Sequence, residues 1–220
     1  MSQEAPSLRD RQTAATREQI LTIAMQQLGQ GPRGTFSHES IAEAAGMGAR
    51  TVYRYFPDRA TLLQALWLRL REATKTRFPE AEAEIVPLAR DVFKEFEINE
   101  LLVRAVITSP AGTEVRERGG AEGRAAFAKS LADALEGLPA NEKARVVAVF
   151  VSIYSAPFWQ LLRDRGLLSG PEAEEAVAWA LDTLIRAAKD LPRTEQHQNT
   201  IESDSPHEQI REGRTPGRRA

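Results

Sequence analysis

"GMGARTVYRYF" (residues 46–56) is the stretch from which the fold of this chain can be worked out. It holds two arginines, a threonine, two tyrosines and a phenylalanine directly behind two glycines, and no other segment of the chain has this composition. If a helix starts after Gly48 and each residue turns it by about 100°, Val52 and Phe56 lie one turn apart and point inward. The outer face then carries two arginines and a threonine between two tyrosines: Arg50, Thr51, Arg54, Tyr53 and Tyr55. The stretch predicts a short helix with a charged, hydrogen-bonding outer face.

The residues before this helix predict the scaffold that it needs, because a helix of barely two turns is not stable alone. Ser37 is a residue type favoured at the N-cap of a helix, and the helix that it would start stops at Gly46. Met47 lies between two glycines, where its side chain would fill the apolar gap between the helices. Residues 37–56 therefore predict a helix-turn-helix, a motif whose second helix enters the major groove of DNA.

The side chains on the outer face match the chemical groups that a DNA duplex displays. Arginine donates two hydrogen bonds to the O6 and N7 acceptors of guanine, and threonine contacts the methyl group of thymine. A tyrosine hydroxyl binds phosphate and thereby fixes the register of the protein on the duplex. The alternative is a solvated charged face without a ligand, and the residue mix favours DNA binding.

Helical periodicity continues through the rest of the chain, and no segment alternates in the way a strand does. Beyond the two helices of the motif, helices are expected at residues 16–29, 59–78, 80–96, 97–108, 121–136, 141–165 and 171–189. The segment "SPAGTEVRERGG" (109–120) is expected to be a broken connection. The predicted fold is all-α, with an N-terminal three-helix helix-turn-helix DNA-binding domain followed by a larger helical ligand-binding and dimerisation domain.

The charge distribution supports this division into two modules. Residues 1–77 hold 11 Lys and Arg against 7 Asp and Glu, whereas residues 78–192 hold 13 against 19. A basic first third and an acidic body indicate different partners. The expected organisation is a flexible arm at 1–13, a DNA-binding domain at 14–74, a helical effector-binding and dimerisation domain at 75–191, and a disordered tail at 192–220.

Composition argues against several other functions. The chain has no cysteine, which excludes disulfides, thiol nucleophiles and thiolate metal sites and suits a cytoplasmic location. His38 is isolated, and His197 and His207 fall in the expected tail, so no metal site, catalytic group or cofactor is predicted. "GQGPRG" (29–34) spells a dinucleotide-binding pattern but follows a helix rather than a strand. The apolar run at 146–162 is interpreted as a buried helix, and no membrane partner is expected.

The segment "IAEAAGMGARTVYRYFPDRATLL" (41–63) resembles the TetR family of bacterial transcriptional regulators. The shared features are Ile-Ala, an Ala-Gly turn, a tyrosine two residues after a threonine, a phenylalanine closing the recognition helix and a basic residue opening the next helix. The resemblance covers residues 14–74 and implies a sequence-specific regulator. Repression is the family's usual mode.

The resemblance also implies individual roles. It implies DNA-facing positions at Ala49, Arg50, Thr51, Tyr53 and Tyr55, phosphate contacts from Ser37, Tyr53 and Arg59, and a DNA contact from His38. Together with Gly48 and Arg54, these are the expected DNA-binding residues. Gly48 stands where the family often has serine, so the cap of the recognition helix is expected to be weaker.

Past residue 77 only the helical architecture of the family carries over. The resemblance to the family implies a homodimer, a palindromic operator and a small-molecule effector bound inside the body. The helices at 141–165 and 171–189 are expected to pair with their symmetry mates in a four-helix interface, which sets the recognition helices about 34–36 Å apart. The second helix has a stripe of mostly small residues for this contact: Ala173, Val177, Ala180, Leu184 and Ala188.

The effector cavity is the least determined part of the prediction. Five aromatic residues could line it: Phe93, Phe96, Phe150, Tyr154 and Trp159. The same residue types form ordinary cores, and core packing is the favoured interpretation for each. Arg104 could hold an anion, but Glu100 lies four residues before it, which favours an ordinary surface ion pair.

Three functions are therefore weighed. A ligand-responsive dimeric repressor is the leading hypothesis, with activation instead of repression as a variant. A helical interaction protein that keeps the motif without specific DNA binding is the second. An enzyme is the third, and no residues support it.

Overall fold

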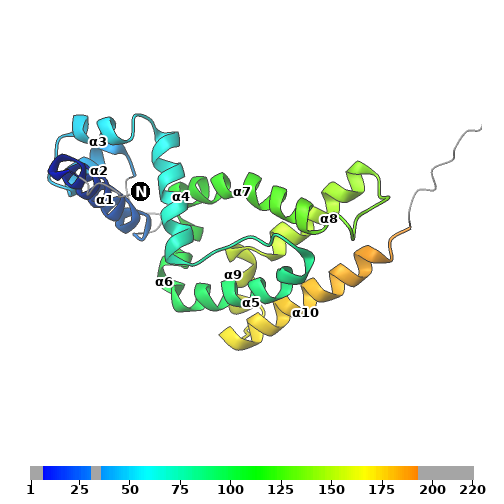
Figure 1. The fold of residues 1–220 in the computed structure, drawn as a ribbon. Helices are drawn as coiled ribbons and strands as arrows, with labels where there is room; N and C mark the ends of the chain where they lie inside the picture. The colour runs from blue at the N-terminus through cyan, green and yellow to red at the C-terminus, as the bar shows by residue number, and fades with distance from the viewer. Residues whose placement is uncertain (1–6, 31–35, 193–220) are drawn as a thin grey trace, which may run out of the picture.

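The computed structural model describes residues 7–30 and 36–192, and all regular structure in these two ranges is helical (Figure 1). The helices are α1 (Leu8–Leu28), α2 (His38–Ala44), α3 (Ala49–Tyr55), α4 (Arg59–Ala73), α5 (Glu82–Ile98), α6 (Glu100–Thr108), α7 (Pro110–Ser130), α8 (Ala140–Ile153), α9 (Ala156–Asp164) and α10 (Gly170–Lys189). The all-α prediction is thereby confirmed. The expected tail beyond residue 192 and most of the "GQGPRG" segment lie outside the described residues.

The helices form two hydrophobic cores that meet at α4 and α7. The first core is built from α1–α4 and closes on Val106 of α6 and Val115 of α7. The second core joins the remaining helices of the body, with α10 packed along α5. Figure 1 shows α1–α3 gathered at one end of the molecule and α4 standing between them and the body. The helix-turn-helix is therefore attached to the body through α4.

The contact between α4 and α7 depends on a glycine. Gly119 of α7 is buried against the indole of Trp67, and a Cβ at Gly119 would lie 2.1 Å from Trp67 Cζ2. Such a distance is far inside van der Waals contact, so only glycine permits this approach of the two helices. Arg71 of α4 also pairs with Glu122 of α7 at 2.5 Å.

The first helix begins earlier than predicted. α1 starts at Leu8, inside the segment 1–13 that was assigned to a flexible arm. Ser7 and Asp10 form a capping box, in which Ser7 Oγ accepts from the Asp10 N–H at 3.2 Å and the Asp10 carboxylate accepts from the Ser7 N–H at 3.1 Å. This reciprocal pair satisfies two N–H groups at the helix start, and the polar composition of the segment concealed it.

The predicted break at 109–120 is wrong, because these residues belong to the single helix α7. Ser109 caps the helix by accepting from the Gly112 N–H at 2.9 Å, and Pro110 occupies its first turn, where no N–H is needed. Residues 131–136, predicted as the end of a helix, form turns after α7 ends.

The predicted helix at 141–165 is divided in two. α8 ends at Ile153, and α9 begins at Ala156 after Ser155, which caps it by accepting from the Phe158 N–H at 3.3 Å. Within the described ranges, no single helix is long and apolar enough to cross a membrane. Helices α8 and α9 are long and apolar enough only when they are taken together, and a bend of 58° separates them.

The sequence predicts that the stripe of small residues on α10 packs against a second copy of the chain, but most of this stripe faces the protomer's own core. Ala173, Val177 and Ala188 are buried in the chain's own second core, where α10 packs against α5. Leu184 is half-buried against the same core. The small residues therefore permit close packing inside the protomer. The side of α10 that is open to solvent carries Trp179, which is 71% exposed.

Candidate nucleic-acid interface

The turn between α2 and α3 is fixed by local hydrogen bonds. Gly46 has a positive φ of 64°, a conformation that glycine adopts readily and other residues rarely do. The Met47 N–H donates to the Ala42 carbonyl at 3.0 Å, and the Gly46 N–H donates to the Glu43 carbonyl at 3.1 Å. These two bonds form a Schellman motif, which ends α2 and directs the chain into α3.

The start of α2 is capped as predicted. Ser37 Oγ accepts from the Ser40 N–H at 3.0 Å, and Ser40 Oγ accepts from the Ser37 N–H at 2.9 Å. Gln27 of α1 donates to the Ser40 carbonyl at 3.0 Å and so ties α2 to α1. The first helix thereby holds the motif from behind.

The two faces of α3 divide as the helical pattern predicts. Val52 and Phe56 have no exposed surface and lie in the first core. The opposite side, which we call the α3 outer face, comprises Ala49, Arg50, Thr51, Tyr53, Arg54 and Tyr55. Both arginines are exposed, and the Arg54 guanidinium lies 5.2 Å from the ring centre of Tyr55. Gly48 provides the N-cap of α3 without a side-chain hydrogen bond.

His38 is not part of this outer face. Its side chain is buried, and its Nε2 lies 2.9 Å from the Phe56 carbonyl oxygen, to which it donates. The imidazole also stacks on the Tyr53 ring, with ring centres 4.4 Å apart and planes within 3°. His38 thus joins the first turn of α2 to the end of α3, whereas the DNA contact expected from it would need an exposed side chain.

Tyr53 is held in place on its exposed side as well. Its hydroxyl donates to Glu39 Oε1 at 2.9 Å, and this bond raises the pKa of Tyr53. No sequence pattern singles out Glu39. The residue stands in the first turn of α2, next to His38, and only the packing of α2 on α3 brings it to the tyrosine.

Arg59, in the first turn of α4, forms a two-pronged ion pair with the body. Its Nε and Nη2 donate to the two carboxylate oxygens of Glu114 on α7 at 2.8 and 2.7 Å. Its Nη1 also donates to the Phe36 carbonyl at 3.2 Å. The hydrogen bonds from Arg59 lower the pKa of Glu114, which stays ionised. In this conformation the guanidinium expected to bind phosphate is bound to a carboxylate.

Residues 20–66, which include the turn and the α3 outer face, match the family model for bacterial regulatory proteins of the tetR family. This match identifies the N-terminal domain as one of the TetR type. The HTH-type transcriptional repressor LfrR of Mycolicibacterium smegmatis is 33% identical over 84 residues, which are 38% of this chain and 43% of LfrR. The match thus spans less than half the length of that relative.

One solved structure extends the likeness from the N-terminal domain to the overall fold. A tetR-family transcriptional regulator from Streptomyces coelicolor has a TM-score of 0.53 and 19% sequence identity over 80% of this chain and 83% of its own. A TetR transcriptional regulator from Rhodococcus sp. RHA1 gives a lower TM-score of 0.42, also at 19% identity, over 79% and 98% of the two chains. The first likeness shows that this chain shares the fold of that regulator beyond the helix-turn-helix.

The body of the chain contains a cavity of about 200 Å³ behind the α4–α7 contact. Two of the five aromatic candidates, Phe96 and Tyr154, line it. Phe93, Phe150 and Trp159 are instead packed in the second core, each with at most 1% of its surface exposed. The cavity wall also includes Trp67, Phe78 and Arg116, which the sequence did not single out.

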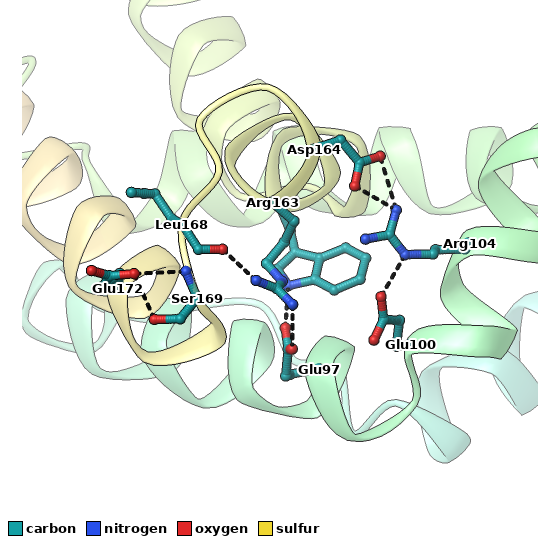
Figure 2. A network of polar contacts seen from close by, with 9 residues as sticks. Glu97, Glu100, Arg104, Arg163, Asp164, Leu168, Ser169 and Glu172 are labelled. Carbon is teal, nitrogen blue, oxygen red and sulfur yellow. Dashed lines mark hydrogen bonds and ion pairs between the residues drawn. The ribbon is translucent and has the colours of Figure 1, made fainter.

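Arg104 forms the ion pair that the sequence favours, and a second one besides. It pairs with Glu100 at 2.7 Å and with Asp164 of α9 at 2.8 Å, above the Trp159 ring (Figure 2). Glu97 accepts from Trp159 Nε1 at 3.3 Å and from Arg163 at 3.0 Å. These contacts fasten α9 to α5 and α6, so the charge of Arg104 is used inside the fold.

Proposed function

We propose that this TetR chain is a homodimeric, sequence-specific DNA-binding regulator. In this proposal it represses transcription from a palindromic operator in the cytoplasm, and a small molecule bound in the body releases it. The observation that carries the proposal is the α3 outer face, where Arg50 and Arg54 are exposed while Val52 and Phe56 anchor the helix from below.

The geometry of this face suits the major groove. Val52 and Phe56 fix the orientation of α3, so the guanidinium groups of Arg50 and Arg54 need little reorganisation before they reach base edges. Each good pair of hydrogen bonds from an arginine to guanine contributes about 1–3 kcal/mol of discrimination. Thr51 and Tyr55 are half-buried at the border of the same face, where contacts to thymine methyl groups or phosphates are within reach.

Phosphate contacts would replace two contacts that exist within the free chain. The Tyr53 hydroxyl binds Glu39, and the Arg59 guanidinium binds Glu114, so a carboxylate occupies each group in the absence of DNA. A phosphate oxygen is an equivalent acceptor for both donors. In this proposal Tyr53, Arg59 and Ser37 position the protein on the backbone, and α3 reads the sequence.

Exposed apolar surface on the body supports a dimer. Trp179 of α10 is 71% exposed, and Val149 of α8 and Leu161 of α9 are 45% and 47% exposed. Only Val147 and Phe150 of the apolar helix α8 are buried within the protomer. A second copy that packs on α8 and α10 would cover these side chains and place two α3 helices against one face of the duplex.

The position of the cavity supports a ligand response. Trp67 and Leu70 of α4 and its C-cap residue Thr74 form part of the wall, and the first turn of the same helix carries Arg59. A ligand that binds one orientation of α4 more tightly would favour that orientation and so change the spacing of the two recognition helices. The ligand's difference in affinity for the two states sets how far this equilibrium shifts.

Selection of bound fragments from random duplex DNA tests the proposal. We expect recovery of a palindrome with half-sites about 10–10.5 base pairs apart, or a multiple of that spacing. Affinity for the selected site should fall steeply with salt as phosphate contacts release counterions. Binding that is indifferent to both sequence and salt would instead favour a helical interaction protein. A reporter placed behind the selected site separates repression from activation.

Size measurement in solution tests the dimer. We expect the wild-type chain to be a dimer, and Trp179→Glu to give a monomer with weaker operator binding, because the charge falls on the proposed contact. Leu101→Glu is the matched control, since Leu101 is 88% exposed but belongs to α6 and not to α8 or α10. A monomeric wild-type chain at micromolar concentration would contradict the predicted operator spacing.

A further inference from the structure

The cavity behind α4 has an apolar, aromatic wall. Trp67, Phe78, Phe96 and Tyr154 contribute rings, and Val103 and Val106 contribute aliphatic groups. Its volume is about 200 Å³. A cavity of roughly 150 Å³ is known to hold benzene, so this one has room for a single ring with a small substituent.

The hydroxyl groups around the cavity already have partners within the protein. Tyr154 Oη donates to the Arg77 carbonyl at 2.7 Å, and Thr74 Oγ1 donates to the Leu70 carbonyl at 2.8 Å. Ser155 Oγ donates to the Ser152 carbonyl at 2.6 Å. These groups stabilise the wall and leave no unmet need for a polar ligand group.

Arg116 of α7 differs from them. Its Nε is buried and has no hydrogen-bond partner, although its Nη2 donates to Thr113 Oγ1 at 3.1 Å and, at 3.5 Å, to the Ile107 carbonyl. Within residues 7–30 and 36–192, no carboxylate forms an ion pair with it, and Glu117 acts on it only at longer range. A buried donor without a partner is costly, and the half-buried Arg116 side chain keeps this one Nε–H away from solvent.

We propose that the cavity binds a small monocyclic aromatic carboxylate, with the ring against Trp67, Phe78 and Tyr154 and the carboxylate on Arg116. The proposal rests on the function proposed above and names the chemical class of its effector. Arg116 supplies the charge and a free N–H, and the aromatic wall supplies stacking surface.

The volume and the charge together narrow the ligand class. A cavity of about 200 Å³ suits a single ring with a small substituent, and a cationic ligand would be repelled by Arg116. A neutral ring would fill the space but leave the buried Nε–H unpaired. A carboxylate meets both requirements, because it is planar and accepts from a guanidinium at two points.

Benzoate and benzamide are matched probes for calorimetric titration of the full chain without DNA. They share the ring and the planar head group but differ in charge. We expect benzoate to bind at least about tenfold more tightly, because hydrogen bonds to a charged partner are the stronger class. Equal affinities for the two probes, or no benzoate binding at millimolar concentrations, would overturn the proposal.

Variants locate the contact. Arg116→Met removes the charge and keeps the length, and we expect it to bind benzoate and benzamide within about twofold of each other. Arg118→Met is the matched control, because Arg118 is exposed on the same helix, and it should keep the wild-type preference. Should Arg116→Met fail to fold, Arg116→Gln serves the same comparison. A benzoate preference that survives the loss of Arg116 would place the anion elsewhere and refute the assignment.

The outcomes separate this inference from the proposed function. Operator selection without benzoate binding would leave the DNA-binding proposal standing and reject the ligand class. Benzoate binding without operator selection would support the site and reject the regulator. Benzoate that also lowers operator affinity in wild type, but not in Arg116→Met, would support both.

Discussion

Arg59 and Glu114 are joined by two parallel hydrogen bonds, which tie the first turn of α4 to α7 across 55 residues of sequence. The pair links the DNA-binding end of the molecule to its body. Both side chains are about two-fifths exposed, at 43% and 40%, so the pair contributes little to stability. Its proposed consequence is for function, because the pair occupies the guanidinium that we propose binds phosphate.

The pair predicts opposite effects of its two partners on DNA affinity. Arg59→Met should weaken binding to all sequences alike and reduce the slope of log affinity against log salt by about 1, because one phosphate contact is lost. Glu114→Gln should strengthen binding by a few fold, since a neutral amide competes less well with phosphate. Duplex titrations at several salt concentrations measure both. Weaker binding by Glu114→Gln would show that the ion pair orients Arg59 for DNA instead of competing with it.

Arg50 on the α3 outer face should carry sequence discrimination. Arg50→Ala should cost about 1–3 kcal/mol of preference for the selected operator over a mismatched one, with the fold intact. Competition titrations with the two duplexes measure the preference, and Arg124→Ala on α7, also exposed, is the control. If thermal stability falls while operator preference is unchanged, Arg50 serves the fold and not the reading of bases.

His38 should act on stability and not on base preference. His38→Ala leaves the Phe56 carbonyl without its partner and removes the ring under Tyr53, so we expect unfolding to become easier by about 1–3 kcal/mol. Denaturant unfolding measures the loss. In duplex titrations the ratio between operator and mismatched site should stay near that of wild type, and a changed ratio would return His38 to the DNA interface.

Two neighbouring glycines of α7 should respond to alanine in opposite directions. Gly119→Ala places a Cβ 2.1 Å from Trp67 Cζ2, and overpacking of this kind costs about 1–3 kcal/mol. At Gly120 the nearest atom is the flexible Arg124 Nη1 at 3.3 Å, so alanine there should stabilise the helix by about 0.5–1 kcal/mol. Thermal unfolding of both variants measures the contrast. Equal effects would show that α4 does not pack on α7 as closely as described.

The parts of the fold that could be predicted from the sequence depend on interactions between residues close together in the chain. The N-cap at Ser37, the positive φ at Gly46 and the inward pair Val52 and Phe56 all involve residues within one motif. Capping, turn geometry and helical period depend on neighbours a few residues away. The helix-turn-helix and its outer face could therefore be predicted.

The sequence-based predictions were wrong where a sequence pattern fits more than one structure or where the contacting residue is distant in the chain. The segment 109–120 was expected to be a broken connection, but it is helical, and Gly119 allows the ring of Trp67 to approach the helix. The small residues of α10 suggested a dimer seam, but Ala173 and Val177 pack inside the protomer. A small residue permits close approach without specifying which surface approaches.

The sequence by itself determined the all-α class, the helix-turn-helix and the division of α3 into an anchored and an exposed face. These follow from backbone preferences and helical period, which a chain carries locally. Only the tertiary structure decided that Arg59 binds Glu114, that His38 supports Phe56 and that Arg116 faces an apolar cavity. The first two contacts join residues 18 and 55 positions apart, and the third joins different helices. Tertiary packing brings such residues together, and no local sequence pattern indicates which residues will meet.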